Sequence, residues 1–146
     1  MTYEQCIDQM EKMALIINKR LETILCEGLT PPLTFPNIRL LSILKTSEET
    51  TMTDIANHYG ITLSGATGLV DRMVELKLVS RERRENDRRI VVIHITEKGR
   101  EQLDRIKTNS IKLFDGCFSD LSNEEIDIYF KVLNKITSCI LSDKEK

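Results

Sequence analysis

The chain has 146 residues, a length typical of one domain. Hydrophobic residues make up 40% and charged residues 30%, which excludes a disordered chain. The longest stretch without charge, residues 55–70, contains polar residues and glycines, so we expect no membrane span. Because acidic residues precede any long apolar run at the start of the chain, we also expect no secretory signal and a soluble, cytoplasmic protein.

Charge is unevenly distributed along the chain. The whole sequence holds 21 basic and 23 acidic residues, but residues 72–100 hold nine basic and five acidic ones. A local excess of positive charge is what phosphate binding requires, even in a chain of acidic isoelectric point. An ordinary solvated charged surface is the alternative interpretation.

Four widely spaced cysteines, with no C-x-x-C pair and only two histidines, argue against a zinc site and a disulfide scaffold (Cys6, Cys26, Cys117 and Cys139). We expect buried thiols that pack as small hydrophobic residues. Neither a metal nor a cofactor is expected.

The first half of the chain predicts two helices. Residues 2–27 form a long one, because Thr2 and Gln5 have the spacing of a capping box and apolar residues recur every three or four positions. Gly28 and the prolines after it end this helix. A shorter helix is expected from about Pro36, and residues 45–50 are expected to form a turn.

The middle of the chain predicts two short helices and a hairpin. Thr51 and Asp54 begin a helix that ends at Gly60, and a second helix covers residues 64–76. Alternating residues from Val79 and a β-branched run at residues 90–95 then predict two strands joined by a polar tip, residues 84–89.

Two helices return at the end. Thr96 caps the first, which runs to about residue 117, and Ser122 with Glu125 begins the second. The fold class is therefore mainly α (α+β). Two helices joined by a tight turn, followed at once by a basic hairpin, predict a winged helix-turn-helix, in which one helix enters the major groove and the hairpin contacts phosphates or the minor groove.

Several motifs closely resemble the MarR family of transcription regulators. They are Leu33-Thr-Phe-Pro-Asn-Ile-Arg-Leu-Leu41, Leu63-Ser-Gly-Ala-Thr-Gly-Leu-Val-Asp-Arg-Met73, Leu78-Val-Ser-Arg81, Asn86-Asp-Arg-Arg89 and Ile95-Thr-Glu-Lys-Gly99. The resemblance covers about residues 10–142. It implies one domain over 1–146, with a winged helix-turn-helix at about 36–97 and dimerisation helices at about 2–27 and 97–142. It also implies a homodimer.

Chemistry assigns roles in binding double-stranded DNA. At the start of the second short helix, Thr62, Ser64 and Thr67 can reach phosphates or base edges, and Arg72 can reach a phosphate or a guanine. Arg89 is the candidate for the minor groove, held by Asp87, although an ordinary hairpin ion pair is the alternative. Three further arginines are expected to contact phosphates: Arg83, Arg84 and Arg88. Gly65 and Gly68 depart from the family pattern, which places larger residues there.

Similarity to the MarR family implies release from DNA by a small ligand or an oxidant. For a small apolar or aromatic effector, we expect a cleft lined by Met10, Met13, Ile17, Phe35 and Ile38, although plain core packing is the alternative for each. Cys26 is the best candidate for an exposed thiol, but no basic residue near it in sequence would activate it.

The function predicted from these observations is a sequence-specific regulator that acts as a homodimer. We expect a repressor that binds a pseudo-palindromic operator and is released by a small molecule. The alternatives are a thiol-based redox sensor and a winged-helix protein-interaction module that does not bind DNA. An enzyme is not expected, because the sequence contains no motif for a catalytic serine, zinc or phosphate loop.

Overall fold

A computed structural model describes residues 2–47, 49–84, 86–87 and 90–142, without the side chains of 140 and 141. The chain divides into two compact units, residues 1–110 and 111–146, and each is described by itself. The described residues are mostly helical with one small antiparallel sheet, as the sequence predicted.

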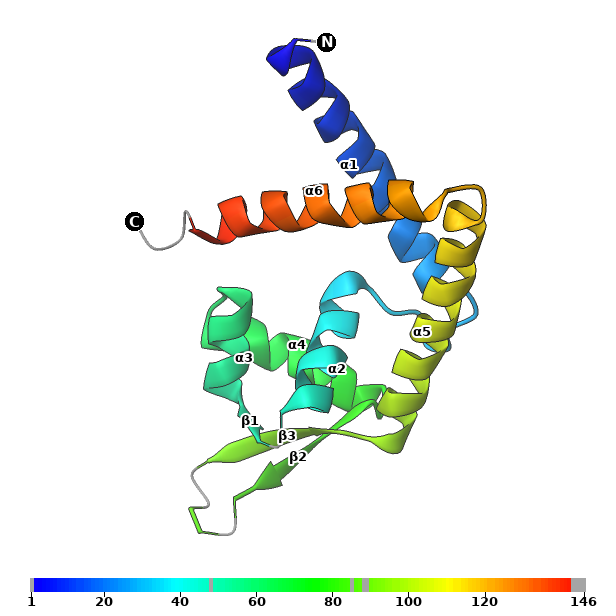
Figure 1. The fold of residues 1–146 in the computed structure, drawn as a ribbon. Coiled ribbons are helices and arrows are strands. Elements are labelled where there is room, and N and C mark those ends of the chain that lie inside the picture. Colours follow the sequence, from blue (N-terminus) through cyan, green and yellow to red (C-terminus); the bar gives the residue numbers. More distant parts are fainter. Residues whose placement is uncertain (1, 48, 85, 88–89, 143–146) are drawn as a thin grey trace. The chain divides into compact units, whose positions relative to one another are not determined.

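The first unit contains the winged helix (Figure 1). Its elements in chain order are α2 (Phe35–Thr46), β1 (Thr50–Thr51), α3 (Met52–Tyr59), α4 (Leu63–Glu75), β2 (Val79–Arg83) and β3 (Val91–Ile95). The sheet order is β1-β3-β2, with Val79 opposite Ile95 and Thr50 opposite Ile93. Helices α2, α3 and α4 gather on one side of the β2–β3 hairpin, which we call the wing.

The core of this unit lies between the three short helices and the sheet. Its largest fully buried side chains come from all of these parts: Leu40, Leu41, Ile55, Val70, Met73, Leu78 and Ile93. Ala56 of α3 is also buried. Burial of this apolar surface is the main source of stability in the winged helix.

Helix α1 (Tyr3–Leu25) begins with the predicted capping box of Thr2 and Gln5, and none of its residues is buried. Hydrogen bonds hold its end. Asn109 Nδ2 donates to the Leu25 and Glu27 carbonyls at 3.1 and 3.0 Å, and Glu22 Oε1 accepts from the Phe35 backbone N–H at 3.1 Å. These contacts tie the end of α1 to α2 and to α5 (Glu97–Phe118).

The start of α5 packs closely on the turn between α4 and β2. Thr96 Oγ1 accepts from the Gly99 N–H at 3.1 Å, as expected of a helix cap, and also donates to the Lys77 carbonyl at 2.8 Å. A Cβ atom at position 99 would overlap the Leu78 carbonyl oxygen. Glycine is therefore required there for packing, not for an unusual backbone angle.

The second unit contains the end of α5 and α6 (Asn123–Ser142). Ser122 and Glu125 form the predicted capping box before α6. Four aromatic rings, Phe114, Phe118, Tyr129 and Phe130, pack in sequence with centroids 5.3–5.7 Å apart. Phe114 and Phe130 nevertheless remain about half exposed.

Three predictions need correction. Residues 45–50 are not simply a turn, because α2 continues to Thr46 and residue 50 begins β1. Cys26 is only partly exposed and packs against the core, because the end of α1 is held there. Cys117 and Cys139 are exposed in this chain, whereas buried thiols were expected.

Candidate nucleic-acid interface

The turn between α3 and α4 places the start of α4 at the surface. Gly60 ends α3 with a φ of 64°, a left-handed conformation that favours glycine, and the Ile61 N–H then donates to the Ala56 carbonyl at 3.0 Å. Thr62 caps α4 by accepting from the Gly65 N–H at 3.2 Å. This arrangement is a helix-turn-helix, and α4 is its recognition helix.

The predicted DNA-contacting side chains of α4 are all exposed. Ser64 and Arg72 lie eight residues apart and so share the outer face of the helix with Gly68 between them. The Thr67 hydroxyl donates to the Leu63 carbonyl at 2.8 Å, so its oxygen offers only acceptor capacity to a ligand. Thr62 is engaged in the cap but is also exposed.

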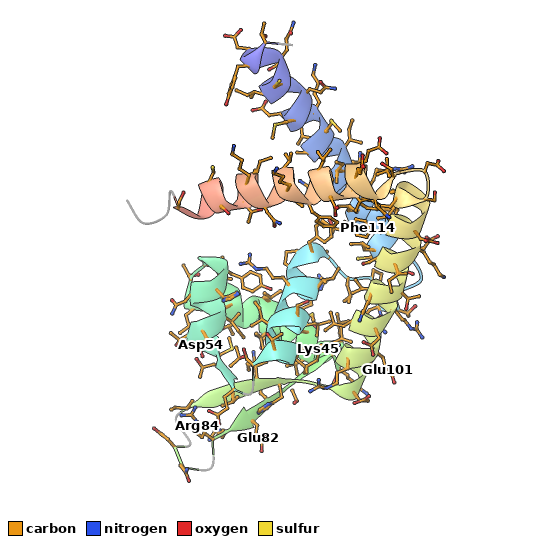
Figure 2. All side chains as sticks on the ribbon, in the orientation of Figure 1. Lys45, Asp54, Glu82, Arg84, Glu101 and Phe114 are labelled. Carbon is orange, nitrogen blue, oxygen red and sulfur yellow. The ribbon has the colours of Figure 1, made fainter. Side chains whose placement is uncertain are left out.

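The wing contains the remaining predicted residues. Arg83, at the end of β2, is exposed, and Asp87 lies in the exposed tip, where its carbonyl accepts from the Ile90 N–H at 3.0 Å. Arg84, which follows β2 in the wing (Figure 2), is half-buried and forms an ion pair with Glu49, a partner that the sequence did not predict. Arg88 and Arg89 lie outside the described residues.

A second ion pair joins the wing to the recognition helix. Arg81 of β2 lies 2.5 Å from Asp71 of α4, and both side chains are partly exposed. Two arginines of the basic segment are therefore compensated by acids of the same chain. Such pairs contribute little to stability, but they fix where the charges lie and reduce the number of uncompensated cations that face DNA.

Comparison with known proteins matches this geometry. The MarR family model matches residues 28–90. The transcriptional regulator BldR of Sulfolobus solfataricus is 30% identical, with a TM-score of 0.65 over 94% of this chain and 99% of that one. The chain belongs to the MarR family.

Two further relatives agree with this assignment. The regulator MgrA of Staphylococcus aureus is 28% identical over 78% of this chain and 76% of its own. FabT of Streptococcus pneumoniae, solved in complex with DNA, shares the fold with a TM-score of 0.82 at 18% identity, over 97% of this chain and 99% of that one. This MarR-family chain is thus a winged-helix, DNA-binding transcription regulator. No described helix is long and apolar enough to cross a membrane.

The MarR-family chain has an apolar cavity of about 430 Å³, wide open to solvent, between α2 and α3. Phe35, Pro36, Ile38, Arg39 and Tyr59 line it. The Tyr59 hydroxyl donates to the Pro36 carbonyl at 2.7 Å, and burial raises the pKa of Tyr59 to about 12 despite the opposing effect of nearby Arg39. The phenol therefore stays neutral at physiological pH.

Only two of the predicted effector residues, Phe35 and Ile38, line this cavity. Met10, Met13 and Ile17 instead lie on α1 with about half of each side chain exposed. The sequence did not predict Arg39 or Tyr59, although the Arg39 guanidinium lies 4.9 Å from the Tyr59 ring centroid and donates to the His58 carbonyl at 2.9 Å. This cation–π contact places a positive charge at one wall of an otherwise apolar cavity.

The surroundings of Cys26 do not favour a reactive thiol. Burial first, and the neighbouring Glu22 carboxylate second, raise the pKa of the Cys26 thiol, which disfavours the reactive thiolate. Within the described part of the chain, no group of three or more His, Cys, Asp or Glu side chains is placed to hold a metal ion.

Proposed function

We propose that this chain is a homodimeric repressor that binds a pseudo-palindromic operator and is released by a small molecule. The observation that carries the proposal is the pairing of two different surfaces in one chain. One is the exposed start of α4 with the wing, and the other is the uncovered apolar surface of α1 and α6. FabT, which has the same fold, was solved in complex with DNA, and this supports the first part of the proposal.

Dimerisation accounts for the apolar surface. Large hydrophobic side chains between 40% and 90% exposed occur along both terminal regions: Tyr3, Ile7, Met10, Met13, Leu15, Ile16, Ile17, Ile111, Phe114, Leu121, Ile128, Tyr129, Phe130, Val132 and Leu133. A folded monomer rarely leaves so much apolar surface in water, and a second copy of the chain would cover it. Two-fold symmetry then requires an inverted repeat whose half-site centres are roughly 10 bp apart.

Within each half-site, the recognition helix and the wing have different tasks. Ser64, Thr67 and Arg72 face the major groove from α4, with Thr62 at its first turn, and Arg83 contacts a phosphate. Arg88 is assigned to a phosphate, and Arg89, oriented by Asp87, to the adjacent minor groove. These wing roles rest on the sequence motif.

The effector is proposed to be small and either apolar or aromatic. The cavity beside Tyr59 supports this class, because its walls are mainly apolar and Arg39 adds one cation that suits an acidic substituent. Met10, Met13 and Ile17 would contribute only if the assembled dimer brings α1 to such a site.

Redox sensing is the weaker alternative, because the pKa of Cys26 is raised. We expect each single Cys→Ser substitution to leave the effect of peroxide on DNA release the same as in the wild type. A peroxide response that Cys26→Ser alone abolishes would replace the small-molecule proposal with a thiol mechanism.

Selection of binding sites from random duplexes tests the proposal. We expect an inverted repeat, and a gel shift at two salt concentrations separates DNA binding from a protein-interaction role.

The binding of the Arg89→Ala variant is then compared on the operator, a flank-substituted operator and random DNA. We expect loss mainly on the operator and weaker preference for flanking A·T pairs; Asp87→Ala should have the same effect but smaller. Equal loss on all three duplexes would make Arg89 a phosphate contact, and failure to select any duplex would contradict the proposal.

A further inference from the structure

Two exposed hydrophobic side chains of the winged helix are not explained by dimerisation. Among the described residues, the exposed large hydrophobic side chains cluster on α1, on the second unit, and at only one other place. That place holds Ile61 and Leu63, which are 40% and 56% exposed. All other large apolar side chains between α1 and residue 110 are at least partly buried, so this pair is an exception within a well-packed unit.

The pair lies at the start of the recognition helix. Ile61 and Leu63 flank the cap residue Thr62, and Leu63 is the first residue of α4. Gly65 leaves space beside Ile61, because a Cβ there would lie 3.6–3.7 Å from the Ile61 side chain. In a helix-turn-helix, the N-terminal residues of the recognition helix contact base edges in the major groove.

Two of the exposed hydroxyls at this end of α4 are engaged within the helix. Thr62 accepts from the Gly65 N–H, and the Thr67 hydroxyl proton is donated to the Leu63 carbonyl. Ile61 and Leu63 form the apolar part of this surface, beside the exposed side chains of Thr62, Ser64 and Thr67. The apolar group that base pairs present in the major groove is the C5-methyl of thymine.

Glycine at position 68 supports a close approach of α4 to the bases. Gly68 has no positive φ, and a Cβ there would meet no atom of the chain within 4 Å, so the fold does not require glycine. Glycine nevertheless weakens a helix relative to alanine. Gly68 lies between Ser64 and Arg72 on the outer face of α4. Because it has no side chain, nothing protrudes from the centre of that face.

We infer that Ile61 and Leu63 recognise thymine methyl groups at each half-site, a role that rests on the proposed DNA-binding function. The occupant of this apolar surface is therefore duplex DNA, not a second protein chain. Arg72 of the same helix and Arg83 of the wing are exposed, and their positive charge is complementary to the duplex backbone.

The test removes single methyl groups from the DNA. Each thymine of the selected operator is replaced in turn by deoxyuridine, and the affinity of the wild-type protein is measured. We expect about a fourfold loss at one or two positions in each half-site, the effect of about 0.8 kcal/mol for one methyl group removed from water. All other positions should change less than twofold.

Variants assign the methyl contacts to side chains. The Leu63→Ala variant should bind the thymine operator about as weakly as the wild type binds the deoxyuridine operator. Replacing the sensitive thymine by deoxyuridine should then weaken binding of the variant no further. Ile61→Ala should do the same at a second position. Leu63→Met should keep the sensitivity. Ser64→Ala removes a hydroxyl that we assign to DNA, so it should weaken binding to the thymine and deoxyuridine operators by the same factor and leave the ratio between them unchanged.

The possible failures are distinguishable. If no duplex is selected, both the proposed function and this inference are wrong. If an operator is bound but no deoxyuridine substitution matters, or if both alanine variants retain full sensitivity, DNA binding stands and the thymine contact is wrong. A scan of the wild-type protein without any sensitive position overturns the inference even if a variant fails to fold, and Leu63→Met provides a second variant if Leu63→Ala does.

Discussion

The winged helix and the terminal helices differ in how far their apolar residues are buried. In the winged helix, leucines and isoleucines from three helices and a sheet are buried or partly buried, and among its described large apolar residues only Ile61 and Leu63 are exposed. Helices α1 and α6 are also amphipathic, but α1 contains no buried residue, and neither does the part of α6 whose side chains are described. The first region buries its apolar residues within one chain, whereas the second leaves them exposed. The same residue types therefore form a core in one region and, in the other, the surface that the proposed dimer would cover.

The largest expected effect comes from a charge on the apolar face of α6. Leu133→Asp should shift the protein from dimer to monomer at micromolar concentration, a loss of at least 100-fold in dimer affinity, because an unpaired carboxylate would be buried. Sedimentation measures the change. Lys131→Asp, on the opposite face of the same helix, is the control and should remain dimeric; if Leu133→Asp also stays dimeric, α6 is not the interface.

Next in size is the core of the winged helix. Leu40→Ala should lower the free energy of unfolding by about 2–5 kcal/mol, because it leaves a cavity at a fully buried site. Leu63→Ala removes the same atoms from an exposed site and should change the free energy of unfolding by about 0.5 kcal/mol or less. Chemical denaturation compares the two, and similar losses would contradict the burial described for this region.

A smaller effect separates the wing arginines. Arg83→Ala should flatten the dependence of log affinity on log salt by about one unit of slope, because one phosphate contact is lost. Arg84→Ala should change the slope by less than half as much, because Arg84 is paired with Glu49. Conversely, Glu49→Gln should strengthen binding to random duplexes. Equal slopes for the two arginine variants would show that the ion pair opens on DNA.

The smallest effect concerns the capping boxes of the two regions. Hydrogen bonds from Thr51 lower the pKa of Asp54, and those from Ser122 lower the pKa of Glu125. A lowered pKa means that each cap stabilises its helix at neutral pH and loses this effect as pH falls through the lowered pKa. Thr51→Ala should return the pKa of Asp54 toward 3.8 and cost about 1 kcal/mol. NMR titration measures the pKa of Asp54 in the Thr51→Ala variant, and the pKa of Glu125, which should not change, is the control.

Local features of the fold could be predicted from the sequence. The capping boxes at Thr51 and Ser122 involve partners three residues apart, and Gly60 ends α3 with the positive φ expected of it. The exposure of Ser64 and Arg72 likewise follows from helical periodicity once the buried face of α4 is assigned.

Contacts between distant parts of the chain could not be predicted. Glu49 and Arg84 are 35 residues apart, and Asn109 reaches the end of α1 across more than 80 residues. No spacing rule joins such pairs, because tertiary packing places them. Ile61 and Leu63 were missed for a different reason: apolar residues in a helical pattern normally predict core, and only their exposure distinguishes them.

The close packing of Gly99 on Leu78 also governs how motion passes through the first unit. Besides Thr96, the Lys98 ammonium donates to the Leu76 carbonyl at 3.0 Å, so the first turn of α5 holds three consecutive carbonyls between α4 and β2. With no side chain at position 99, there is no flexible group to absorb a shift. We therefore expect a change in the direction of the first turn of α5 to displace the end of the recognition helix and the base of the wing together.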